Sequence, residues 1–74
     1  MRKIVEINTP SSCLNKAKDD EMLFILLGRD KAAPQAILYW CETRIRMGLN
    51  VKDDPQIKEA MRCALEMQHD QLAH

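Results

Sequence analysis

Three cationic side chains and two adjacent aromatic rings are the residues of this chain best suited to bind a ligand. Arg29 and Lys31 flank an aspartate, Tyr39 and Trp40 follow in a helical pattern, and Arg44 comes four residues after the tryptophan. Guanidinium and ammonium groups bind phosphates and carboxylates, and an aromatic ring can stack on a base or on a guanidinium. The candidate ligand- or partner-binding residues are therefore Arg29, Lys31, Tyr39, Trp40 and Arg44.

Metal binding and covalent catalysis are not favoured by the spacing of cysteine and histidine. Cys13, Cys41, Cys63, His69 and His74 form no C-x-x-C or H-x-x-x-H pair. Both histidines lie at the end of the chain, where a terminal helix is expected to fray and would position a catalytic base poorly. We therefore expect no metal, no cofactor and no catalytic residue, and predict that the protein is not an enzyme.

The length of the chain predicts one small domain, and its charge balance predicts a surface that is not broadly charged. The 74 residues include 11 basic and 11 acidic side chains, and 46% of the residues are hydrophobic. This balance argues against a broad electrostatic surface for nucleic acid or an anionic membrane. An odd number of cysteines, an apolar run of only six residues and the absence of a signal-peptide pattern predict a soluble cytoplasmic protein.

A helix is predicted over residues 32–48. Pro34 is tolerated only in the first turn of a helix, so the helix should begin near residues 30–33, with Asp30 as a candidate N-cap. Gly48 is the expected stop. The apolar residues of this helix cover an arc of about 200°, wider than one partner helix can bury. A third segment or a second subunit should therefore cover the remainder.

A second helix is predicted over residues 55–72. Asp54 followed by Pro55 has the form of an N-cap and a first helical residue. The connection between the two helices is short and polar, so they should pack as an antiparallel hairpin. Gln68 and Gln71 lie at or beside the apolar face of this helix, where polar contacts at a rim or between subunits are expected.

The chain before the hairpin is harder to assign. Residues 21–28 contain the apolar run MLFILL, which can be a buried helix or a buried strand. We favour a short apolar helix because Met and Leu dominate, and the competing interpretation pairs this run with residues 3–7 as strands. The N-terminal segment itself is expected to be a short strand or an extended arm. The predicted fold class is all-α, with one domain over residues 1–74.

Arg44 interrupts the apolar arc of the first hairpin helix. Because it lies one helical turn after Trp40, its guanidinium can stack on the indole. One interpretation is an arginine whose stem packs while its charged end reaches solvent, and the other is an anchor for an anion or a partner carboxylate.

A motif over Glu21–Trp40 resembles one found in short uncharacterised proteins of phages and bacteria. The pattern is E-x-x-F-x-L-x-x-R-D-x-x-A-P-x-x-I-x-x-W, and Met22 stands where those proteins often have proline. The resemblance implies a small cytoplasmic accessory protein encoded by a phage, but it implies no activity. The matching residues are Glu21, Phe24, Leu26, Arg29, Asp30, Ala33, Pro34, Ile37 and Trp40.

Three functional hypotheses follow. The first is a non-enzymatic, homo-oligomeric protein that binds a host protein or a small signalling molecule, as in counter-defence. The second is a sponge for cyclic nucleotides, in which the cations meet phosphates and an aromatic ring stacks a base; its basis is an analogy of size and architecture. The third is a small DNA-binding regulator, which is disfavoured because the connection is longer than a helix-turn-helix turn. No membrane partner is expected.

Overall fold

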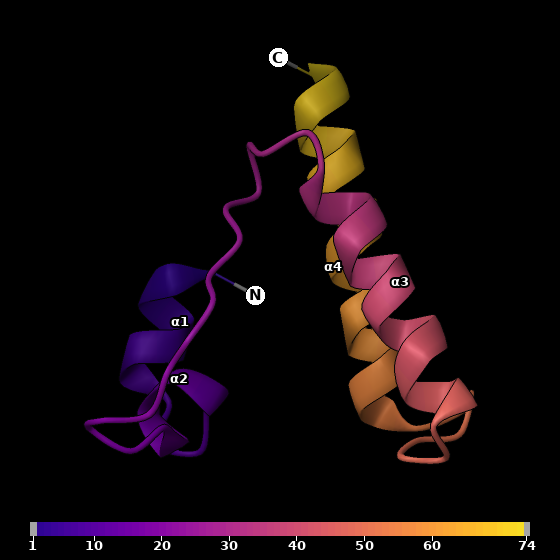
Figure 1. Cartoon of the computed structure of the whole chain (residues 1–74). Coiled ribbons are helices and arrows are strands. Elements are labelled where there is room, and N and C mark those ends of the chain that lie inside the picture. The colour runs from indigo at the N-terminus through magenta and orange to yellow at the C-terminus, as the bar shows by residue number, and fades with distance from the viewer. Residues whose placement is uncertain (1, 74) are drawn as a thin grey trace.

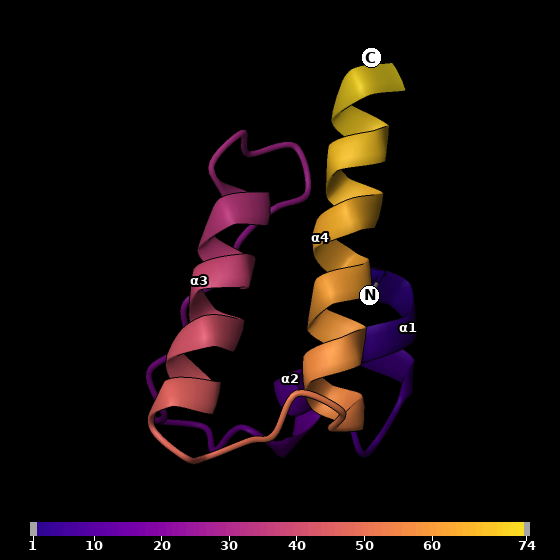
Figure 2. The same ribbon diagram turned by 90° about the vertical axis from the view of Figure 1, so that its right-hand side faces the viewer.

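The fold is all-α and is dominated by an antiparallel helical hairpin, as the sequence predicted. The computed structural model describes residues 2–73 and contains the helices α1 (Lys3–Asn8), α2 (Cys13–Lys16), α3 (Ala33–Arg46) and α4 (Pro55–Ala73). Helix α3 packs along α4, and α1 packs against α2 (Figures 1 and 2). Among these described helices, neither pair packs on the other.

The start of α3 corrects the predicted role of Asp30. Ala32 is the N-cap residue and Pro34 lies in the first turn. The Asp30 carboxylate instead accepts a hydrogen bond from the Ala32 N–H at 2.8 Å. The main-chain carbonyl of Asp30 accepts a second one, from the Ala33 N–H at 3.0 Å. Had Asp30 been the N-cap, Pro34 would occupy a position that needs a helical N–H. Asp30 therefore forms an Asx turn that leads into the helix.

Helix α3 ends at the predicted glycine. Gly48 has a φ of 75°, a left-handed conformation that glycine adopts without the steric cost of a Cβ. The Gly48 N–H donates to the Ile45 carbonyl and the Leu49 N–H to the Arg44 carbonyl, both at 3.0 Å. This pair of bonds is a Schellman motif, which satisfies the last carbonyls of the helix and turns the chain towards α4.

The N-terminal segment is helical, so its prediction as a strand or extended arm was wrong. A strand needs a partner for its backbone, whereas α1 satisfies much of its backbone locally. The side-chain amide of Asn15 closes the end of α1, lying 2.8–2.9 Å from the carbonyl oxygens of Glu6, Ile7 and Thr9. Ser12 adds a 2.7 Å bond to the Glu6 carbonyl and caps α2.

The apolar run before the hairpin is neither the helix nor the strand that the sequence predicted. Residues 21–27 form an extended connection that leads from α2 to the start of α3 (Figure 1). Phe24 is 88% exposed and Met22 is 95% exposed. Six residues are too few for an isolated helix in water, and no strand among residues 2–73 lies beside them.

The hydrophobic core of the hairpin is small. The buried apolar side chains are Ala33, Cys41, Ile57, Cys63 and Ala64, together with Pro34. The radius of gyration is 13.1 Å, whereas a compact chain of this length has about 11 Å. The accessible surface is 6410 Å², about 1,700 Å² more than a compact monomer of this mass exposes. Much apolar surface therefore remains uncovered in the single chain.

No helix within residues 2–73 has the length and apolar character required to cross a membrane.

Candidate functional site

The five candidate binding residues are spread along α3, with Arg29 and Lys31 just before the helix, Tyr39 and Trp40 at its middle and Arg44 in its last turn. Arg44 therefore lies near the hairpin turn, whereas Arg29 and Lys31 lie beside the end of α4. The rise from Ala33 to Arg44 is about 17 Å at 1.5 Å per residue. A single chain therefore does not bring Arg29 and Lys31 together with Arg44 around one small anion.

Arg44 joins α3 to the hairpin turn. Its guanidinium carbon lies 5.4 Å from the centre of the Trp40 ring, so the predicted stacking is present. Its Nε donates a hydrogen bond to the side-chain oxygen of Asn50. Arg44 is only partly exposed, which agrees with an arginine whose stem packs and whose charged end reaches the edge of the apolar face.

Asn50 and Asp54 extend this contact through the turn. The Asn50 amide donates to the Asp54 carboxylate at 2.9 Å and to the Gln56 side chain at 3.2 Å. The same carboxylate oxygen accepts the Val51 N–H at 3.0 Å. The hydrogen bonds that Asp54 accepts from Asn50 and Val51 lower its pKa, and the bond from Asn50 has the larger effect. Arg44, Asn50 and Asp54 therefore form a turn network that fixes the hairpin connection.

The aromatic pair faces outward to different degrees. Tyr39 is 64% exposed and Trp40 is 39% exposed. The face of the Trp40 ring that carries Arg44 is already occupied by a guanidinium. Tyr39 is consequently the more accessible stacking surface of the two.

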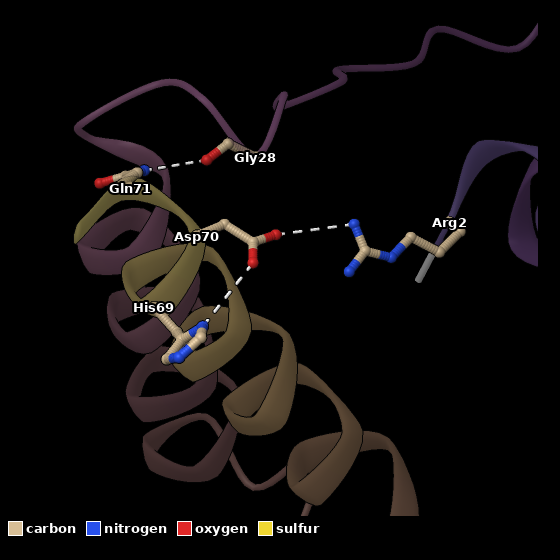
Figure 3. Close-up of polar contacts among 5 residues, drawn as sticks. All are labelled: Arg2, Gly28, His69, Asp70 and Gln71. Atoms are coloured by element: carbon tan, nitrogen blue, oxygen red, sulfur yellow. Dashed lines mark hydrogen bonds and ion pairs between the residues drawn. The ribbon is translucent and has the colours of Figure 1, made fainter. Parts of the chain in front are cut away.

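Gln71 holds the chain at the other end of α3. Its side-chain nitrogen donates to the carbonyl oxygens of Gly28 and Asp30, each at 2.9 Å (Figure 3 shows the Gly28 bond). Both amide hydrogens are therefore used, and the turn that carries Arg29 is tied to the last turns of α4. A Cβ on Gly28 would meet the Met67 side chain at 3.5 Å, an ordinary contact, so this position does not require glycine for space.

Arg29 and Lys31 line an open depression beside this tie. Their charged ends have no hydrogen bond or ion pair with any residue in the described range 2–73. Arg2 reaches the same depression and lies 3.6 Å from the Asp70 carboxylate, which is also 3.9 Å from His69 (Figure 3). The complete lining is Arg2, Gly28, Arg29, Lys31, Gln68, Asp70, Gln71 and Leu72.

The charge in this depression is net positive. Arg2, Arg29 and Lys31 contribute three cations against the single carboxylate of Asp70 among the lining residues. All four side chains are exposed, so water and salt screen them. The arrangement can attract an anion or an acidic surface, and its donors are arginine, lysine and glutamine side chains.

Three polar residues that organise the structure were not identified as such from the sequence. From the sequence, Asn15 has no predicted role, Asn50 falls in the polar connection and Gln71 is expected at a rim or subunit contact. The role of Asn50 in the hairpin turn could have been inferred from its position, two residues after the glycine that ends α3. Asn15 and Gln71 make contacts 6 to 43 residues away in the chain, which local patterns do not reveal.

The cysteines differ in exposure. Cys13 is exposed, whereas Cys41 and Cys63 are buried. Burial raises the pKa of the Cys41 thiol. Within the part of the chain that the structure describes, no group of three or more His, Cys, Asp or Glu side chains is placed to hold a metal ion. His74 lies outside that part.

Comparison of the chain with protein-family models, with curated proteins and with solved structures finds no match.

Proposed function

We propose that this protein is a small, non-enzymatic accessory protein that acts by binding as a homo-oligomer in the cytoplasm. Its target would be a host protein or a small signalling molecule. A phage origin, and with it a role in counter-defence, follows from the motif in Glu21–Trp40 and remains a prediction.

The observation that carries the proposal is the surface left uncovered by one chain. The excess of about 1,700 Å² over a compact monomer is twice the roughly 800 Å² that each partner buries in a standard protein–protein interface. Much of the uncovered surface is large and apolar, and it includes Phe24, Met22 and Leu72, each at least 88% exposed. Apolar surface of this extent is typical of interaction sites.

Sedimentation velocity between 1 and 100 μM tests the oligomer. We expect a mass of two chains or more, with dissociation only at the lowest concentrations. A mass of 8.6 kDa throughout that range would reject homo-oligomerisation. Native mass spectrometry of protein purified from its own host then tests the second half of the proposal, because a bound protein or metabolite adds a defined mass.

Sequestration of a nucleotide signal is a second candidate function, and the basic depression is the observation in its favour. Arg29 and Lys31 have no partner within residues 2–73, and the Gln68 amide lies beside them, whereas the Gln71 amide hydrogens are already bonded to Gly28 and Asp30. Calorimetric titration with cyclic mononucleotides and dinucleotides tests this candidate. Binding should be lost in Arg29→Ala/Lys31→Ala and kept in Lys52→Ala, which alters an exposed lysine of the hairpin turn. No heat with any nucleotide would exclude it.

A further inference from the structure

We propose that residues Met22–Leu27 pair with the same segment of a second copy as an antiparallel two-stranded β-ribbon. The proposal rests on the homo-oligomer proposed above and assigns its contact surface. It also names the orientation and the register of the two chains.

Most of the backbone of this segment forms no hydrogen bond in the single chain, the exception being the Leu27 carbonyl, which accepts from the Asp30 N–H. Its residues are extended, and the N–H and C=O groups of Met22–Leu26 form no hydrogen bond with any described residue. An extended segment with such groups is a template for pairing with another strand. Five of its six side chains are exposed as well, from 50% at Leu23 to 95% at Met22, and Leu26 is half-buried.

The charges at the two ends of the segment make it self-complementary. The acidic residues Asp19, Asp20 and Glu21 precede it, and the basic residues Arg29 and Lys31 follow it. Antiparallel pairing of two copies places the acidic end of each beside the basic end of the other. Parallel pairing would place like charges together, which is unfavourable. Because Arg29 and Lys31 have no charge partner within residues 2–73, both are available for this contact.

One register satisfies these charges best. With the two-fold axis at Ile25, the Glu21 end of each segment comes beside the turn of the other copy that carries Arg29 and that begins at the hydrogen bond between Leu27 and Asp30. Asp30 lies in the same turn as Arg29, and its carboxylate is already bonded to the Ala32 N–H. A shift of one residue would move Glu21 away from Arg29, so that it faces Gly28 in one direction or Asp30 in the other. In the favoured register, Leu23 lies opposite Leu27 and Ile25 lies opposite itself.

The ribbon has two apolar faces and therefore needs cover on both. Alternate side chains of a strand point to opposite faces, so Leu23, Ile25 and Leu27 form one face and Met22, Phe24 and Leu26 the other. A two-stranded ribbon alone is marginal in water. The surplus surface of each chain exceeds what a standard interface requires, which leaves apolar helix surface to pack on the ribbon.

Disulfide cross-linking of the full chain tests the register. In a Cys13→Ser background, Ile25→Cys places two thiols directly opposite, where Cα atoms are about 4.5–5.5 Å apart and a disulfide can form. The matched control Leu23→Cys places its two thiols about four residues out of register, beyond disulfide reach. We expect mild oxidation to cross-link Ile25→Cys at least tenfold faster. Both changes are at exposed positions, and far-UV circular dichroism checks that the helices remain.

Charge reversal tests the orientation without any new cysteine. Glu21→Lys and Arg29→Glu should each weaken the dimer by about fivefold or more in sedimentation equilibrium, since each removes two symmetry-related pairs. The double variant should recover most of the loss, because the pairs re-form with the signs exchanged.

The outcomes separate this proposal from the one on which it rests. A dimeric wild type in which Ile25→Cys cross-links no faster than Leu23→Cys, or in which the double variant shows no recovery, overturns the ribbon and leaves the oligomer intact. A wild type that is monomeric to 100 μM overturns both. Selective cross-linking together with charge recovery supports both.

Discussion

The guanidinium carbon of Arg44 lies 5.4 Å from the centre of the Trp40 ring, one helical turn earlier on α3. The same guanidinium donates to Asn50 in the hairpin turn. Arg44 thus links a helix face to the connection that follows it. This gives a structural role to a residue that the sequence also offered as an anion anchor.

Replacing Arg44 by alanine should destabilise the hairpin. The change removes the contact with Trp40 and leaves Asn50 without its charged donor, for a loss of about 1–2 kcal/mol in the free energy of unfolding. Urea titration followed by the fluorescence of Trp40, the single tryptophan, measures it. The control Arg46→Ala removes an exposed arginine whose hydrogen bond to Thr43 is 3.4 Å long, and should cost under about 0.5 kcal/mol. Equal losses would contradict this role of Arg44.

The turn network should make stability depend on pH. Hydrogen bonds from Asn50 and Val51 hold the pKa of Asp54 below its value in the unfolded chain, about 3.9. The stabilisation is therefore complete above that value and is lost as the pH falls through the lower folded pKa. We expect Asp54→Asn to be less stable than wild type in urea at pH 7, and the difference to close towards pH 3. Asp53→Asn is the control, and a difference that persists at low pH would argue against the network.

Thiol reactivity should follow burial. Cys13 is exposed, whereas Cys41 has no exposed surface and its thiol pKa is raised by burial, so less of it is thiolate at pH 8. A chromogenic disulfide reagent should modify one thiol per chain rapidly and the other two slowly. Cys13→Ser should abolish the rapid phase. A rapid phase that survives in that variant would show that the packing of α3 on α4 is looser than described.

Gln71→Ala should loosen the start of α3 while leaving the hairpin folded. The change removes the two hydrogen bonds to Gly28 and Asp30 across an exposed surface, so global stability should fall by under about 1 kcal/mol. Hydrogen exchange at the Ala32 and Ala33 amides should accelerate several-fold. Gln68→Ala, one turn earlier on α4, is the matched control and should leave those amides unchanged. Equal acceleration in both variants would contradict the tie.

The sequence predicted the elements whose ends are marked locally. Pro34, Gly48 and Pro55 act within one helical turn of their own positions, so the bounds of α3 and α4 followed from them. The predicted stacking of Arg44 on Trp40 also needed only helical spacing.

The remaining structure depends on contacts that spacing does not encode. Residues 3–7, with the sequence KIVEI, are of types typical of strands, but they are helical and the end of their helix is closed by Asn15 from the following helix. The MLFILL run has a composition suited to burial and is instead exposed in the single chain. The sequence suggested Arg29, Lys31 and Arg44 as one set because all three are cationic. The length of helix α3 places Arg44 far from the other two.

The two hydrogen bonds from Gln71 to the Gly28 and Asp30 carbonyls influence which substitutions the chain can accept. Its acceptors are backbone carbonyls, which every residue type presents alike. The contact therefore constrains the identity of Gln71 but places no demand on the side chains at positions 28 to 31. Apart from Asp30, whose carboxylate bonds the Ala32 N–H, the turn bearing Arg29 and Lys31 can accumulate changes of charge and size while its path remains fixed. A protein that must follow a changing target would gain from such a site, because its recognition surface can vary on an unchanged scaffold.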